Sequence, residues 1–175
     1  MNTEALERYL NSFGKYVVQQ SRTNLTKGKK NVSKDLYNSI SFKVVTTSKG
    51  FSVQFYMDSY GTFVDKGVSG TKVKRSFKDY KGRTISSPYK YTTKQPPSRV
   101  LDKWIVKKGI APRDEKGRFM SRKSISFLIA RSIKRKGIQG ISFFQKPLML
   151  GLKQFGKEML GAVKDDIING LTTVK

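Results

Sequence analysis

Residues that do chemistry are scarce in this sequence. It contains no cysteine and no histidine, so thiol nucleophiles, zinc–thiolate sites and imidazole bases are excluded. A nucleophile would have to be a serine, threonine or lysine with a carboxylate or a second lysine as its base. Three segments contain such residue types and define the chemistry to be considered.

The first segment is GVSGTK at 67–72. It superficially resembles a nucleophile elbow or a phosphate-binding loop. However, it has neither the G-x-S-x-G spacing of an elbow nor the GK[ST] of a phosphate loop. We therefore interpret it as the root of a flexible loop.

The other two segments are the acid pairs Asp114-Glu115 and Asp165-Asp166. Adjacent acids can bind Mg²⁺ or serve a hydrolase. Opposite charges flank the first pair, which is typical of a solvated turn. The second pair lies on a predicted helix, where successive side chains point about 100° apart. Both are interpreted as surface charge, and the sequence predicts no enzyme activity, no cofactor and no metal site.

A stronger signal is the basic stretch 72–94, in which four aromatic residues alternate with lysines and arginines. Cations follow phosphates and aromatic rings stack on unpaired bases, so this pattern suits a single-strand binder. Charge runs are also often solvated faces, and tyrosines often dock a loop onto the protein body. The candidate contacts for nucleic acid, another anion or a neighbouring subunit are Lys72, Lys74, Arg75, Lys78, Lys81 and Arg83.

Two predicted helices begin with cations. Arg99 follows the predicted cap Ser98, and Arg122 and Lys123 follow the predicted cap Ser121. Cations in a first helical turn oppose the macrodipole, unless an anion binds there to the free N–H groups. Chance placement in such a basic chain is the alternative. Arg99, Arg122 and Lys123 complete the list of candidate contacts.

The first half of the chain predicts a helix followed by a hairpin. Apolar residues at steps of three and four predict a helix over 3–25, and a short helical turn follows at 33–38. Period-two alternation over 40–47 and 51–57 then predicts antiparallel strands. The turn Ser48-Lys49-Gly50 joins them, with Gly50 in the left-handed position.

The second half is predicted to be mostly helical. A short helix or turn over 58–66 leads into 67–97, which has no sustained period and is expected to be a long basic loop, with a weak pair of strands left open. Helices are predicted over 99–108, from Ser121 to Gly137, and from Pro147. The apolar side of the last helix is predicted to contain Leu148, Leu152, Phe155, Met159, Val163 and Ile167. These elements predict one α+β domain over 1–175, with an N-terminal helix, a small antiparallel sheet built on the hairpin, and a helical C-terminal half.

The charge is what sets this sequence apart. Its 175 residues include 36 Lys and Arg against 12 Asp and Glu, a net charge of +24. Self-repulsion of this size is usually offset by an anionic partner. Composition alone does not distinguish nucleic acid, an anionic membrane and acidic protein surfaces as that partner. No apolar run is long enough to span a membrane, and the first ten residues do not form a signal peptide.

The order of elements resembles a phage family. The stretch Tyr60-Gly61-Thr62-Phe63-Val64-Asp65-Lys66-Gly67-Val68 is similar to the "Y-x-x-[FY]-V-[DE]-x-G-[TV]" segment of the tail-completion, or head–tail joining, proteins of tailed bacteriophages. The segment 96–114, the sequence FLIAR at 127–131, Gly137-Ile138 and FFQKPL at 143–148 also resemble stretches of phage neck or tail proteins.

This resemblance implies a structural virion protein without enzyme activity. Its implied partners are copies of itself in a hexameric or dodecameric ring, together with neighbouring portal, neck and tail-tube proteins. Phage DNA passing through the channel is left open as a further partner, and no membrane is expected. The implied location is the neck or tail of the virion, after assembly in the host cytoplasm.

Two other functions remain as alternatives. The first is a basic protein that binds nucleic acid without sequence preference. The second is a membrane-active basic domain, which is disfavoured because the cations do not segregate onto one amphipathic helix.

Overall fold

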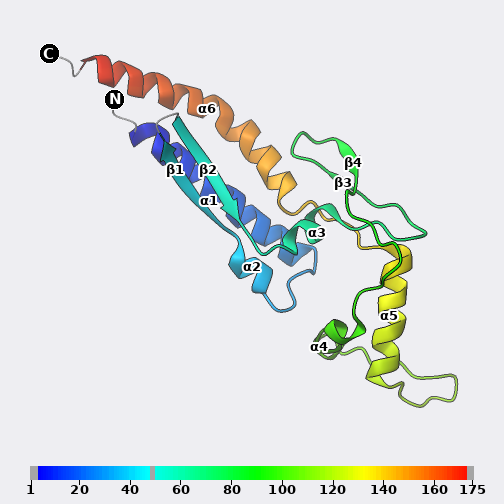
Figure 1. Ribbon diagram of the computed structural model, residues 1–175. Coiled ribbons are helices and arrows are strands. Elements are labelled where there is room, and N and C mark those ends of the chain that lie inside the picture. The colour runs from blue at the N-terminus through cyan, green and yellow to red at the C-terminus, as the bar shows by residue number, and fades with distance from the viewer. Residues whose placement is uncertain (1–3, 48–49, 173–175) are drawn as a thin grey trace. The chain divides into compact units, whose positions relative to one another are not determined.

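The computed structural model describes residues 4–47 and 50–172, and side chains as far as Lys164. It is an α+β protein with a long N-terminal helix, a two-stranded antiparallel hairpin and a helical C-terminal half, as predicted (Figure 1). The elements are α1 (Glu4–Lys27), α2 (Asp35–Ser39), β1 (Ser41–Thr47), β2 (Gly50–Tyr56), α3 (Gly61–Lys66), β3 (Ser76–Lys78), β4 (Thr84–Ser86), the 3₁₀ helix η1 (Ser98–Leu101), α4 (Asp102–Lys107), α5 (Arg122–Lys136) and α6 (Gln145–Thr172).

The chain forms two compact units, each discontinuous in sequence. Unit 1 comprises Met1–Gly61, Lys78–Arg83 and Ser142–Lys175, and unit 2 comprises Thr62–Phe77 and Thr84–Ile141. The prediction of a single domain over 1–175 stays a prediction. None of the helices within the described residues combines the length and apolar character that a membrane crossing requires.

The core of unit 1 lies between α1, the hairpin and α6. Of the stripe Leu6, Leu10, Phe13 and Val17 that predicted α1, the last three are buried and Leu6 is half-buried; Leu25 is buried as well. β1 and β2 pair antiparallel, and Gly50 has a φ of 127° at the predicted turn. Ser48 and Lys49 of that turn, and Thr3 of the predicted first helix, lie outside the described residues. Figure 1 shows α1 in blue beside this hairpin and beside α6 in orange and red.

Aromatic rings fill the space between these elements. The Phe13 ring contacts Phe55 of β2 and Phe155 of α6, with ring centroids 6.1 and 6.0 Å apart. Edge-to-face contacts at such distances are favourable beyond the area that they bury. Gly14 of α1 leaves room for the ring of Phe42, which a Cβ at this position would overlap.

Among the described side chains on the predicted apolar side of α6, one was assigned wrongly; the side chain of Ile167 lies outside the described residues. Leu152 is 46% exposed, and Gly151 is buried in its place, where a Cβ would lie 2.8 Å from the Phe13 ring. The helix begins at Gln145, so Pro147 is its third residue rather than its first. The close approach of α1 selects a glycine at the contact, and a pattern of apolar residues does not report that.

The core of unit 2 is smaller. Ile105 of α4 and Ile125 and Ala130 of α5 are buried where η1 and α4 contact α5. The N-cap prediction for α5 is confirmed, because the Ser121 hydroxyl accepts a hydrogen bond from the Ser124 N–H at 3.1 Å. The prediction for Ser98 was wrong, since this residue is the first of η1 and Pro97 precedes it without a side-chain cap.

The segment 67–97 is hydrogen-bonded along much of its length. It contains the two-stranded sheet of β3 and β4, which is the weak pair of strands that the sequence left open. Further bridges join Val68 to Ile138 and Ser69 to Lys90. The absence of a periodic pattern was therefore a poor guide here, because very short strands and single bridges are too brief to show one.

Candidate anion-binding site

The site begins where the chain after α3 meets the end of α5. The N–H groups of Thr71 and Lys72 donate to the carbonyl oxygens of Lys134 and Arg135, each at 2.9 Å. The last carbonyl groups of a helix lack partners within the helix, so this segment completes the C-terminus of α5. Gly70 makes the approach possible, because a Cβ there would overlap the Arg135 carbonyl group.

The GVSGTK segment is therefore a structural joint. Its Ser69 hydroxyl accepts the Arg75 N–H at 3.0 Å, and its Ser69 N–H donates to the Tyr89 carbonyl oxygen at 2.8 Å. Val68 and Ile138 exchange two backbone hydrogen bonds of 2.8 Å. Held on both sides in this way, the segment is not the free loop root that the sequence suggested.

Arg75, a predicted anion contact, supports the same joint. Its Nε donates to the Lys136 carbonyl oxygen at 2.9 Å, and its Nη1 donates to Gln139 Oε1 at 3.2 Å. A positive charge at this position also favours the negative end of the α5 macrodipole. The donors of Arg75 are thus directed at the protein itself rather than at an external anion.

Arg83 is also engaged within the protein. Its Nε and Nη2 donate to Asp79 Oδ2 at 2.9 and 2.8 Å, and Asp79 Oδ1 accepts the N–H groups of Lys81 and Arg83. Burial raises the pKa of Asp79, but the hydrogen bonds from Arg83 and Lys81 together lower it by more than burial raises it. The pKa of Asp79 therefore lies below its ordinary value. Lys78, the last residue of β3, is exposed, and on the turn the Lys81 Nζ lies 5.7 Å from the Tyr80 ring centroid.

Lys72 and Lys74 line two adjoining hollows of unit 2, which together we call the basic groove. One hollow, of about 650 Å³, lies between Lys72–Val73 and the C-terminal half of α5. The other, of about 610 Å³, is also lined by Lys72 and Val73, together with Ser86 of β4 and Tyr91. The cations that line the groove are Lys72, Lys74, Lys90, Arg131, Arg135 and Lys136.

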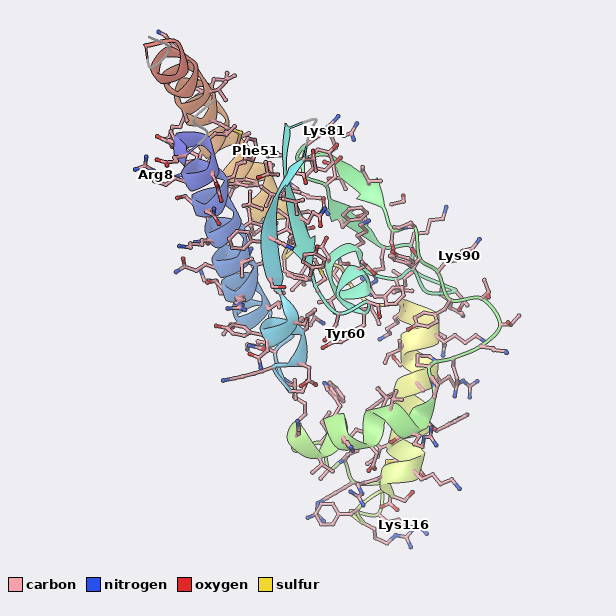
Figure 2. The ribbon with its side chains drawn as sticks, turned by 60° about the vertical axis from the view of Figure 1, so that its left-hand side comes forward. Arg8, Phe51, Tyr60, Lys81, Lys90 and Lys116 are labelled. Carbon is pink, nitrogen blue, oxygen red and sulfur yellow. The ribbon has the colours of Figure 1, made fainter. Side chains whose placement is uncertain are left out.

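The basic groove contains no acid. Neither hollow is lined by Asp or Glu, and none of its six cations forms an ion pair with a described residue. All six side chains are exposed, and Figure 2 shows that of Lys90 pointing away from the ribbon. The floor includes Val73 and Leu128, which are 37% and 51% exposed. Burial raises the pKa of Tyr91 at one end.

The cations at the two predicted helix starts come together in a separate pocket. Arg99 of η1, Lys103 of α4, and Arg122 and Lys123 of α5 line a hollow of about 560 Å³. Asp102 lines the same hollow, and its Oδ1 lies 3.7 Å from the Arg122 Nε. Both side chains of this pair are largely exposed, so the ion pair contributes little stability but does lower the local positive charge.

The first of the two acid pairs closes a turn. Asp114 Oδ1 accepts the N–H groups of Lys116 and Arg118 at 3.0 and 2.9 Å, which closes a turn whose Lys116 is labelled in Figure 2. The side chains of Asp165 and Asp166 lie outside the described residues. Within the part of the chain that the structure describes, no three acids gather where they could hold a metal ion.

The positive charge is concentrated in unit 2. By sequence, unit 2 has 19 Lys and Arg against 4 Asp and Glu, whereas unit 1 has 17 against 8. Unit 2 thus carries +15 of the total charge of +24 although it is the shorter of the two. The basic groove is therefore set in the more positive part of the protein.

Four groove cations were not among the predicted contacts. Lys90 lies in the basic stretch but was not selected, and Arg131, Arg135 and Lys136 lie on the helix predicted after Ser121. Arg131 and Arg135 are spaced i and i+4 on α5, so they share one face of the helix. That spacing was the available signal, but it shows only a basic helix face until the chain around Lys72 supplies the facing wall.

No protein-family model matches the chain, and comparisons with curated proteins and with solved structures find no match.

Proposed function

We propose that this protein is a structural component of a phage neck or tail, which assembles into a ring and joins head to tail or completes the tail. The proposal rests on the sequence resemblance, on the order of elements and on surfaces that a monomer leaves uncovered. It includes no catalytic step.

The observation that carries the proposal is the pairing of two resembling segments. Val68, at the end of the YGTFVDKGV stretch, exchanges backbone hydrogen bonds with Ile138 of the Gly137-Ile138 segment. Gly67 and Gly140 also approach closely, since a Cβ on Gly67 would lie 2.5 Å from the Gly140 nitrogen. Segments that resemble one family and lie seventy residues apart in sequence thus form one structural joint.

The FFQKPL segment has a corresponding role in unit 1. Phe143 is fully buried, and its carbonyl oxygen accepts a hydrogen bond from the Asn24 Nδ2 of α1 at 3.3 Å. The ring of Phe144 lies 5.3 Å from that of Phe55 in β2. The FFQKPL segment therefore contacts both α1 and the hairpin where α6 begins. These are the elements whose order the resemblance uses.

Uncovered apolar surface supports a role in assembly. Five large apolar side chains of unit 2 are between 49% and 66% exposed, namely Val100, Val106, Phe119, Phe127 and Leu128. Where such side chains form a contiguous patch, that patch is typical of a surface that becomes buried against a partner. In a ring, each copy would present one surface to a different surface of the next copy.

The direct test is to inactivate the encoding gene and examine the particles by electron microscopy. We expect heads and tails that form but fail to join or to finish, and restoration when the protein is supplied in trans. Normal, infectious particles in its absence would contradict the proposal. Light scattering of the purified protein at rising concentration gives a second measurement, for which we expect closed oligomers.

A further inference from the structure

We propose that the basic groove of unit 2 binds the phosphodiester backbone of a nucleic acid without reading its sequence. The inference does not depend on the ring. It names a site, its wall residues and the chemistry of its ligand, and it separates these residues from the many other cations of the chain.

The charge of the groove is free to act on a ligand. Arg131, Arg135 and Lys136 line one hollow, Lys74 and Lys90 line the other, and Lys72 lines both. Two of the predicted anion contacts are instead engaged within the protein, since Arg83 pairs with Asp79 and Arg75 binds the end of α5. The six groove cations have no such acid partner among the described residues.

Stabilisation of α5 alone does not explain this arrangement. Cations in the last turn favour the negative end of a helix, and Arg135 and Lys136 occupy that turn. Arg131 precedes the last turn, and Lys72, Lys74 and Lys90 come from other segments. Lys72 caps the helix through its backbone N–H, so the side-chain charges of these four cations are not required for capping.

The geometry favours an extended polyanion. Arg131 and Arg135 lie about 6 Å apart along the helix axis, a span of about two phosphates of one duplex strand. The two hollows share the lining residues Lys72 and Val73, so a ligand that occupies both extends beyond a single phosphate. Hydroxyl groups of Thr71, Ser86 and Ser132 line the same hollows, and hydroxyl groups commonly bind phosphate oxygens. A flat lipid surface would not reach into them.

The test measures binding of a labelled duplex and a labelled single strand, both of random sequence, to the full chain. One triple variant removes the three cations of α5 (Arg131→Gln, Arg135→Gln, Lys136→Gln). A second removes the three groove cations outside α5 (Lys72→Gln, Lys74→Gln, Lys90→Gln). The control makes the same charge change on exposed lysines of α6 in unit 1 (Lys153→Gln, Lys157→Gln, Lys164→Gln). Thermal melting verifies that every variant folds.

We expect the wild-type affinity to fall steeply between about 50 and 200 mM salt. Each groove variant should bind duplex at least about tenfold more weakly and lower the slope of log affinity against log salt by about 2.7. The control should lose much less. Binding of either strand form supports the proposal, and the slope per contact, about 0.9 for duplex and about 0.7 for single strands, identifies which form uses the groove.

Three results would overturn the proposal. The first is no binding of either nucleic acid by the wild-type chain. The second is an equal loss in the control and groove variants, which would mean that only the overall charge matters. The third is polyglutamate that competes as strongly per charge as DNA, which would assign the groove to an acidic protein surface.

Discussion

The Asp79 carboxylate holds the Arg83 guanidinium and two backbone N–H groups at once. Its Oδ2 accepts from the Arg83 Nη2 at 2.8 Å, and its Oδ1 accepts from the N–H groups of Lys81 and Arg83 at 2.9 and 2.8 Å. The two residues flank the turn between β3 and β4. The Asp79 carboxylate thus fixes the turn and also binds the Arg83 guanidinium.

This relationship predicts how stability depends on pH. The pKa of Asp79 is lowered from 3.8 in the folded protein, so its stabilising effect is complete above about pH 4. That contribution is lost as the pH falls through the folded pKa, because the protonated acid no longer accepts these bonds as a carboxylate. Asp79→Asn should lower the melting temperature at neutral pH and should flatten its acid dependence. Melting curves of both proteins between neutral and acid pH measure this, and parallel curves would contradict it.

The second prediction concerns the joint between Gly67 and Gly140. Gly67 has a φ of 74°, and a Cβ there would meet the backbone of Ile138 and Gly140. Gly67→Ala should therefore cost about 2–4 kcal/mol of stability, from backbone strain and overpacking together. Gly109→Ala is the matched control, because Gly109 has a φ of 62° with nothing within 4 Å.

Chemical denaturation of the two variants separates these effects. The control should lose about 1 kcal/mol, the cost of the positive φ alone. Equal losses in both variants would show that the close approach to Gly140 contributes nothing.

The third prediction distinguishes the two serines that precede helices. Ser121→Ala should destabilise the protein by about 1 kcal/mol, because it removes the hydroxyl that accepts the Ser124 N–H. Ser98→Ala should have little effect, since Ser98 does not cap a helix. Denaturation midpoints measure both changes, and a large loss for Ser98→Ala would show that the cap predicted from sequence does form.

The fourth prediction separates structural from ligand-binding cations. Arg75→Gln should lower stability by about 1 kcal/mol, because it weakens the bonds to Lys136 and Gln139, and should leave DNA binding almost unchanged. Lys74→Gln, one residue away and exposed in the groove, should leave stability almost unchanged and should weaken DNA binding. Melting and DNA titration of this pair under the same salt provide the comparison. A loss of DNA binding in Arg75→Gln at unchanged stability would reverse the two assignments.

Local patterns determined the elements of this protein. The recurrence of Leu10, Phe13 and Val17, the alternation of the hairpin and the capping of α5 by Ser121 are all properties of a few consecutive residues. Each depends on backbone geometry that repeats over two to four residues, so the sequence alone was sufficient to place α1, the hairpin and α5. The absence of cysteine and histidine and the charge of +24 are likewise sequence properties.

Tertiary structure alone decided what individual cations do. Arg75, Lys74 and Arg83 are equivalent in a list of basic residues, yet one completes a helix end, one lines the groove and one pairs with Asp79. Those roles depend on which carbonyl group, hollow or carboxylate faces each side chain in the folded chain. The same holds for Gly151, which is buried because the Phe13 ring lies against it. Contacts between residues far apart in sequence leave no periodic pattern, so only the folded chain assigns them.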